Sequence, residues 1–182
     1  MGVLSRSLAR LLLLAAALAA HQAVAQQATE ASIKAAFLYK FAGYIEWPAN
    51  AFAAPDAPLV IGVVGAEEVA AELERLVPGR SVNNRPVVVR RFREGEPIMG
   101  AHILFVGRSE PNLGALVRAA QQNGRALVVT ETERGLEAGG SINFVLVDDR
   151  VGFEVSLEAA ERTGHRISSR MLAVARRVVG RS

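Results

Sequence analysis

The sequence predicts a single three-layer α/β domain in which helices cover both faces of a mostly parallel, mixed β-sheet. Two observations lead to this prediction. Short apolar runs rich in Val and Ile alternate with stretches of helical periodicity, which favours a parallel sheet with crossover helices. Towards the end of the chain, two apolar runs are joined by a short acidic turn, which indicates an antiparallel β-hairpin followed by two helices.

Residues 1–25 have the pattern of a secretory signal peptide. Arg6 and Arg10 give the segment a positive start, and Leu11–Ala20 is an uninterrupted apolar run. The run is about half as long as a membrane span, which argues against an anchor. Removing this segment lowers the formal net charge of +3 by two, and the charges that remain are scattered, which argues against a nucleic-acid partner.

The predicted cleavage site follows the small-x-small rule. It is formed by Ala23, Ala25 and Gln26. Residues 26–182 are then a single exported domain with no later segment of spanning length, and in a bacterium with two membranes it would be periplasmic. Because the chain contains no cysteine, it is not expected to be a lipoprotein, and disulfides, thiol catalysis and Cys-ligated metal are excluded.

The first expected helix covers residues 30–46. Apolar residues recur at four-residue spacing from Ile33 to Ile45, and Pro48 ends the pattern. The apolar run Leu59–Val64 then predicts a strand that is buried on both faces, and a helix over residues 67–77 follows it.

The remaining elements follow the same alternation. Strands are expected at 87–89, 103–106, 126–129, 142–147 and 151–155, and helices at 111–122, 157–163 and 167–179. Pro111 suits the first turn of its helix, and Asn123-Gly124 suits its end. The turn Asp148-Asp149-Arg150 joins the last two strands as a hairpin.

The sequence offers little for catalysis, cofactor binding or metal binding. It has no Walker loop, no nucleophile elbow and no complete dinucleotide fingerprint, and outside the predicted signal peptide its only histidines are His102 and His165. We therefore expect that the protein is not an enzyme and that it binds neither a cofactor nor a metal. Ser168 and Ser169 are expected to cap the last helix rather than to act with His165 as a nucleophile.

The first helix is the most informative element, because it has almost no polar face. Such a helix is either buried on every side or covers its spare face with another chain. A core position is the commoner fate of apolar residues, whereas aromatic anchors are typical of interfaces, and the sequence leaves both open. The covering chain could be a partner or a second copy in a homodimer. The candidate partner-binding residues are Phe37, Phe41, Tyr44 and Trp47.

Several motifs together resemble the YfiR family of periplasmic regulatory proteins. The opening motif, Ile33 to Phe41 followed by Glu46-Trp47-Pro48, is similar to the start of that family. The resemblance continues in the same order along nearly the whole mature chain. The further motifs are Leu59 to Gly65, Asn84 to Val87, His102 to Val106, Gly139 to Phe144, Val151 to Val155 and Ile167 to Leu172.

The resemblance implies a regulator of cyclic-di-GMP signalling and biofilm formation rather than an enzyme. The expected partner is a membrane-bound diguanylate cyclase, whose sensor domain such a protein would bind and repress. Some relatives carry cysteine pairs suited to redox control, which this chain lacks. Two alternatives from other classes remain: a periplasmic solute-binding or sensory module without a cyclase partner, and a hydrolase whose site is assembled from distant loops.

Overall fold

The computed structural model describes residues 29–124 and 126–180. The predicted signal peptide and its cleavage site at Ala23, Ala25 and Gln26 lie outside these residues. Within the described part of the chain, no helix has both the length and the apolar character needed to cross a membrane.

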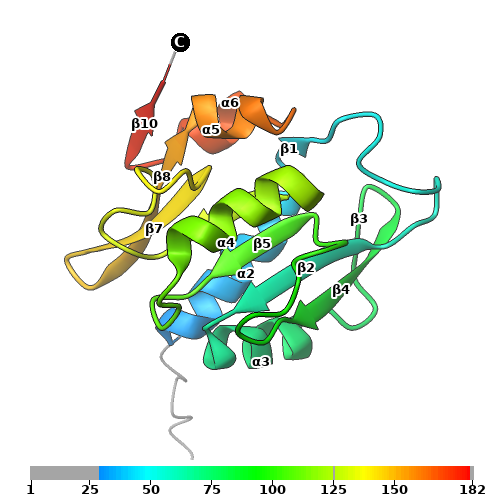
Figure 1. Cartoon of the computed structure of the whole chain (residues 1–182), viewed down its shortest axis with the longest axis horizontal. Coiled ribbons are helices and arrows are strands. Elements are labelled where there is room, and N and C mark those ends of the chain that lie inside the picture. Colours follow the sequence, from blue (N-terminus) through cyan, green and yellow to red (C-terminus); the bar gives the residue numbers. More distant parts are fainter. Residues whose placement is uncertain (1–28, 125, 181–182) are drawn as a thin grey trace, which may run out of the picture.

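The core of the molecule is one eight-stranded sheet in the order β10-β8-β7-β6-β5-β2-β4-β3 (Figure 1). Neighbouring strands are parallel except for two antiparallel pairs, β7 with β8 and β3 with β4. This arrangement confirms the predicted fold class. The strands are β2 Leu59–Val64, β3 Ser81–Val82, β4 Arg85–Arg91, β5 Ile103–Val106, β6 Leu127–Thr130, β7 Ile142–Val147, β8 Arg150–Ser156 and β10 Arg177–Val179.

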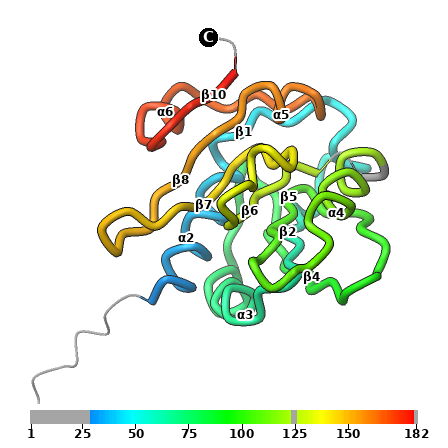
Figure 2. Tube along the Cα trace, turned by 60° about the vertical axis from the view of Figure 1, so that its left-hand side comes forward, coloured from blue at the N-terminus to red at the C-terminus, as the bar shows by residue number. Residues whose placement is uncertain are grey.

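Helices cover both faces of this sheet, as Figures 1 and 2 show. The helices α2 (Glu30–Ala42) and α3 (Glu67–Leu76) share one apolar core with the sheet. On the other face, α4 (Leu113–Ala119) continues into a short π-helical segment, Ala120–Gly124, over a second core. Side chains of β5 alternate between the two cores, which explains its continuous apolar sequence.

The first helix is shorter than expected. Thr29 caps its N-terminus by accepting a hydrogen bond from the amide of Ser32, but the helix ends at Ala42 instead of Glu46. The next residues form β1 (Ile45–Glu46), which pairs with β9 (Arg166–Ile167) in a separate two-stranded sheet. Tertiary pairing with β9 has therefore overridden the helical periodicity at this end.

The last predicted helix, over residues 167–179, is largely wrong. After α5 (Leu157–Arg162), only α6 (Ser169–Leu172) is helical, and Arg177–Val179 instead forms β10, parallel to β8. The expected role of Ser168 is confirmed, because its hydroxyl caps α6 by accepting a hydrogen bond from the amide of Met171. Two adjacent valines suit a strand, and Arg177 forms a bidentate ion pair with Glu154 of β8.

Both edges of the sheet carry arginines. On the β4 side, β3 covers only the start of β4, at Arg85 and Pro86. Further along β4, Arg90 pairs with Glu96, and Arg91 pairs with Glu67 and Glu74 of α3. Arg90 and Arg91 are thus an ion-paired, solvated end of the strand.

Candidate partner-binding face

The four candidate partner-binding residues do not share one surface. Phe41 is 2% exposed and belongs to the core, where its ring lies 5.8 Å from that of Phe144 and 4.9 Å from that of Phe153. Phe37 is half-buried and leans on the same aromatic cluster. Tyr44 is 41% exposed, whereas Trp47 is half-buried and turns towards two histidines.

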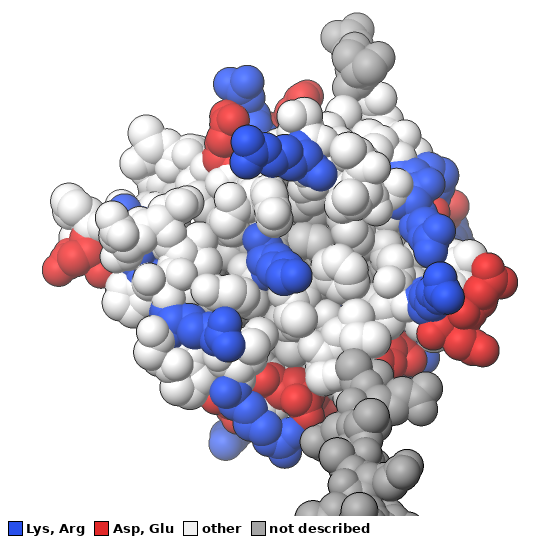
Figure 3. Space-filling view, turned by 180° about the vertical axis from the view of Figure 1, so that it is seen from behind, with Lys and Arg blue, Asp and Glu red and all other residues white. Residues whose placement is uncertain are grey.

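The outward side of α2 is mainly apolar. We define the α2 face as the accessible residues Ile33, Ala36, Phe37 and Lys40 of the helix together with Tyr44 in the turn after it. Figure 3 looks at the molecule from behind the view of Figure 1, the side on which α2 lies. It shows wide uncharged areas crossed by separate basic groups, with acidic groups gathered towards the rim. Accessible aromatic side chains, such as Phe37 and Tyr44 on this face, are typical of protein-binding surfaces.

Trp47 forms one wall of a cavity instead of projecting from this face. Its indole N–H donates to the carbonyl of Ala42, 3.2 Å away at the end of α2. The indole stands edge-on to the rings of His165 and His102, with centroids 5.2 and 6.1 Å away. The cavity beside it has a volume of about 340 Å³ and lies at the amino ends of β2 and β5, where Val60 and His102 line it.

Both histidines in this cavity are held neutral. Burial, with a smaller contribution from His102, lowers the pKa of His165 from 6.5 to about 4. The Nδ1 atom of His165 lies 2.8 Å from the hydroxyl of Thr163, which itself donates to the carbonyl of Ala160. Burial also lowers the pKa of His102, and the charge of Arg85 adds to the shift against the opposing effect of the Ala51 carbonyl.

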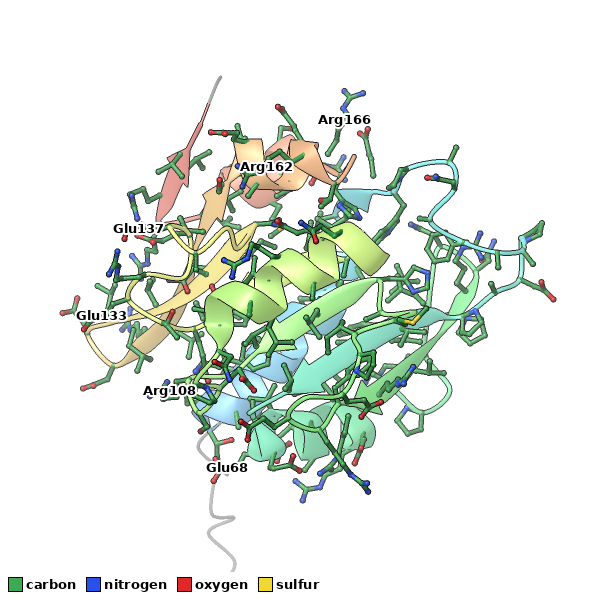
Figure 4. The ribbon with its side chains drawn as sticks, viewed as in Figure 1. Glu68, Arg108, Glu133, Glu137, Arg162 and Arg166 are labelled. Carbon is green, nitrogen blue, oxygen red and sulfur yellow. The ribbon has the colours of Figure 1, made fainter. Side chains whose placement is uncertain are left out.

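A second polar cluster lies at the opposite, carboxyl edge of the sheet. Lys34 of α2 is 3% exposed and pairs with Glu30 and with Glu131, which follows β6. Arg108, which follows β5, pairs with the same two carboxylates. The hydrogen bond from Lys34 holds the pKa of Glu30 below its usual value despite partial burial. Figure 4 shows Arg108 near the start of α2, with Glu68 of α3 close by.

This cluster was not predicted, because its members are separated by about a hundred positions in the sequence. The signal that could have found it is a lysine on the inward side of an otherwise apolar helix, since a buried cation requires a partner. Two cations and two carboxylates already satisfy one another here. The cluster therefore fixes α2 to the carboxyl edge of the sheet and does not by itself call for a ligand.

The described residues do not assemble a metal-ligating cluster. The hydroxyl of Ser168 is directed at its own helix, so the neighbouring His165 and Ser168 do not form a nucleophile–base pair. We treat the α2 face and the Trp47 cavity as the candidate sites of contact with another molecule.

Comparison with known proteins identifies the family of this chain. The profile of the YfiR/HmsC-like family matches residues 31–176, which include every motif of the resemblance. The chain belongs to this family. Members of the YfiR/HmsC-like family are regulatory rather than catalytic, and the family is periplasmic and linked to cyclic-di-GMP signalling through membrane signalling proteins. A search of curated proteins gave no match.

Proposed function

We propose that this protein is an exported regulator that binds the sensor domain of a membrane-bound diguanylate cyclase and represses it, which lowers cyclic-di-GMP. The match of the YfiR/HmsC-like profile over residues 31–176 is the observation that carries this proposal. The proposal includes export through a signal peptide at residues 1–25 and a single mature domain from residue 26 to 182. The small-x-small site before Gln26 supports that division.

Repression of this kind requires that the protein bind one state of the sensor more tightly than the other. A ligand with equal affinity for both states shifts nothing, and a shift from mostly active to mostly inactive requires about 5 kcal/mol of differential binding. In this proposal the protein is a ligand that stabilises the inactive state of the cyclase, and its own fold does not need to change.

We assign the contact to the α2 face. Phe37 and Lys40 are accessible on α2, and the exposed Tyr44 lies in the turn just after the helix. Phe41 lies beneath this surface and supports it, whereas Trp47 lines the neighbouring cavity. A mixed apolar and basic face of this kind suits an extracytoplasmic protein domain with an acidic rim around an apolar pocket.

Two substitutions test this assignment without touching the core. Tyr44→Ala and Lys40→Glu are made in exported, tagged protein, which is used to capture membrane proteins and to measure affinity for the cyclase sensor domain that it retains. We expect Tyr44→Ala to weaken binding by about 2 kcal/mol, or about thirtyfold, with an unchanged melting temperature. The matched control is Val88→Ala on β4, where an equally accessible apolar side chain lies away from α2.

The cellular consequence is tested separately. Deleting the gene should raise cellular cyclic-di-GMP, and exported wild-type protein, but not Tyr44→Ala, should lower it again. Unchanged cyclic-di-GMP after deletion, in cells that express the gene, would contradict the proposal.

A second candidate function is supported by the cavity beside Trp47. Its volume of about 340 Å³ is near the lower limit for small-molecule sites, and its walls combine aromatic and histidine side chains. A solute-binding or sensory module without a cyclase partner would use this cavity. Thermal stabilisation by a small solute, with no retention of any cyclase, would favour this alternative.

A further inference from the structure

The imidazole of His102 replaces one backbone hydrogen bond between the start of β2 and the start of β5. The backbone N–H of His102 donates to the carbonyl of Val60 at 2.9 Å. The ring Nδ1 of His102 accepts from the backbone N–H of Val60 at 3.0 Å. The other ring nitrogen, Nε2, lies 3.1 Å from the carbonyl oxygen of Ala51. One imidazole therefore joins the start of the sheet to the loop that follows Trp47.

These two contacts define which form of the ring fits. The N–H of Val60 can only donate, so Nδ1 must carry a lone pair, and the carbonyl of Ala51 can only accept, so Nε2 must carry the hydrogen. The neutral Nε2–H form satisfies both neighbours. A protonated ring would place a second N–H against the N–H of Val60 and lose that hydrogen bond.

The loop over residues 49–58 depends on the same ring. Phe52 stacks on the imidazole of His102, with ring centroids 4.5 Å apart and planes 19° from parallel. The guanidinium of Arg85 lies 3.8 Å from the centroid of the Phe52 ring, and it donates to the carbonyls of Ala54 and Ala57. The loop is thus held by His102, by the Phe52 stack and by Arg85.

The charged and titratable groups around the ring all oppose a positive charge on it. Arg85 of β4 lies beyond Phe52, and His165, which precedes β9, shares the cavity with His102. Trp47, from the segment after β1, contributes only its neutral edge. Among the described residues, no carboxylate pairs with this ring. Burial, with a smaller contribution from the charge of Arg85, lowers the pKa of His102 below its ordinary 6.5, so the ring is neutral at pH 7.

We propose that His102 is a proton-operated latch: the neutral ring ties the loop over residues 49–58 to the amino edge of the sheet, and protonation releases it. Protonation removes the hydrogen bond from Val60 and places a buried charge near Arg85, while the Nε2–H bond to Ala51 is kept, so the ring moves outwards together with the loop and uncovers the cavity beside Trp47. The protein then has two accessible arrangements of this edge, and acid selects the open one. This inference is independent of the cyclase partner, because it concerns the isolated protein.

Hydrogen exchange of the exported protein between pH 7 and pH 5, corrected for intrinsic exchange rates, tests the latch. In the wild type, we expect the amides of Ala51 and Ala57, which donate to the carbonyls of Pro48 and Ala54, to lose protection at least tenfold as the C2 proton of His102 titrates by NMR, while amides of β5 and β6 keep theirs. His102→Asn retains an acceptor near the Nδ1 position and cannot titrate, so its loop should stay protected throughout. His165→Asn is the matched control and should release the loop as the wild type does.

Arg85→Gln gives a test that does not depend on folding of a His102 variant. Removing the guanidinium charge should raise the midpoint of the His102 titration. Because Arg85 also holds the loop through Ala54 and Ala57, loop protection should already be lower at pH 7, and its remaining loss on acidification should follow the higher midpoint. Three outcomes would overturn the proposal: a loop that stays protected while His102 titrates, equal release in His102→Asn, or simultaneous loss of protection in the loop and in β5.

Discussion

Tyr44 and Trp47 lie only three positions apart, yet one faces solvent and the other lines a cavity. The reason is that α2 ends at Ala42, with Gly43 as its C-cap, and the chain continues after Tyr44 as β1. In a strand, successive side chains alternate, so Ile45 is buried while Tyr44 and Glu46 are exposed. A helix continued to Glu46 would have arranged these residues by helical spacing instead. The sequence therefore identified the aromatic residues of this segment but could not sort them into core and surface.

Replacing Trp47 tests its structural role. Because the indole packs against His165, His102 and Phe52, we expect Trp47→Ala to lower the free energy of unfolding by about 3 kcal/mol. Trp47→Phe keeps a ring but loses the hydrogen bond to Ala42, and it should cost about 1 kcal/mol. Chemical denaturation at pH 7 measures both. Near-native stability of Trp47→Ala together with lost partner binding would instead make Trp47 a contact residue.

The buried Lys34 gives a second prediction at this scale. Lys34→Met leaves Glu131, whose side chain is 7% exposed, with its contacts to Arg108 alone: the backbone N–H at 3.0 Å and the guanidinium at 3.4 Å. Breaking a buried pair from one side typically costs about 3–5 kcal/mol, so we expect a loss in this range. The double variant Lys34→Met/Glu131→Met removes both charges and should recover much of it in the same denaturation measurement. Equal losses in the single and double variants would contradict this account.

At the scale of elements, the β7–β8 hairpin was predicted from its sequence, and the structure confirms it. The turn residues Asp148 and Asp149 both have positive φ angles, 49° and 57°. Aspartate tolerates this conformation, and the two-residue turn matches the twist of the flanking strands. The long apolar strands and the amphipathic α3 were likewise recognisable, because their patterns are local.

The same turn allows a stabilising substitution. Glycine adopts positive φ without a steric penalty, so Asp149→Gly should raise the free energy of unfolding by about 0.5–1 kcal/mol. A melting temperature raised by a few degrees, with unchanged circular dichroism, is the expected observation. Asp149→Val, which places a β-branched residue at the same φ, is the control and should lower it.

Short pairings were not predictable in the same way. The elements β1, β3 and β9 have two residues each, and β10 has three, so none carries a periodic pattern of its own. The segment from Met171 to Val179 contains good helix formers and no Gly or Pro, and only its pairing with β8 makes its end a strand. The two wrong predictions, at the end of the first helix and over most of the last helix, thus come from contacts between distant segments.

At the scale of the whole molecule, acid should destabilise the fold through His165. Its pKa is about 4 in the folded protein and near 6.5 when unfolded. Below pH 6.5 the unfolded chain binds a proton that the folded protein refuses, so stability falls as the pH drops from about 6.5 towards 4. We expect a loss on the order of 2–3 kcal/mol over this range.

Denaturation curves at pH 7 and pH 4.5 measure this loss. His165→Gln should reduce the difference between the two curves, because the variant cannot take up the proton, whereas Arg166→Gln, at an exposed neighbouring position, should leave it unchanged. A difference of the same size in His165→Gln would assign the acid sensitivity to other groups.

The whole fold was more predictable than the site. Alternating patterns fix the layers, because each strand and helix must bury a recognisable apolar surface. The groups that meet at the edges, such as Glu131 with Lys34 or Ala51 with His102, are far apart in sequence and share no motif. Neither the charged cluster nor the histidine cavity could therefore be predicted from one sequence.

The arginines at the two sides of the sheet have a consequence for self-assembly. Unpaired strand edges are templates on which further copies can add and aggregate. Here Arg90 and Arg91 of β4 and Arg177 of β10 place ion-paired charges along both ends of the sheet. A second chain that extended the sheet would have to displace those pairs and bury their charges. Higher-order association through strand addition is thereby disfavoured, and any complex that this protein forms must be built on its faces.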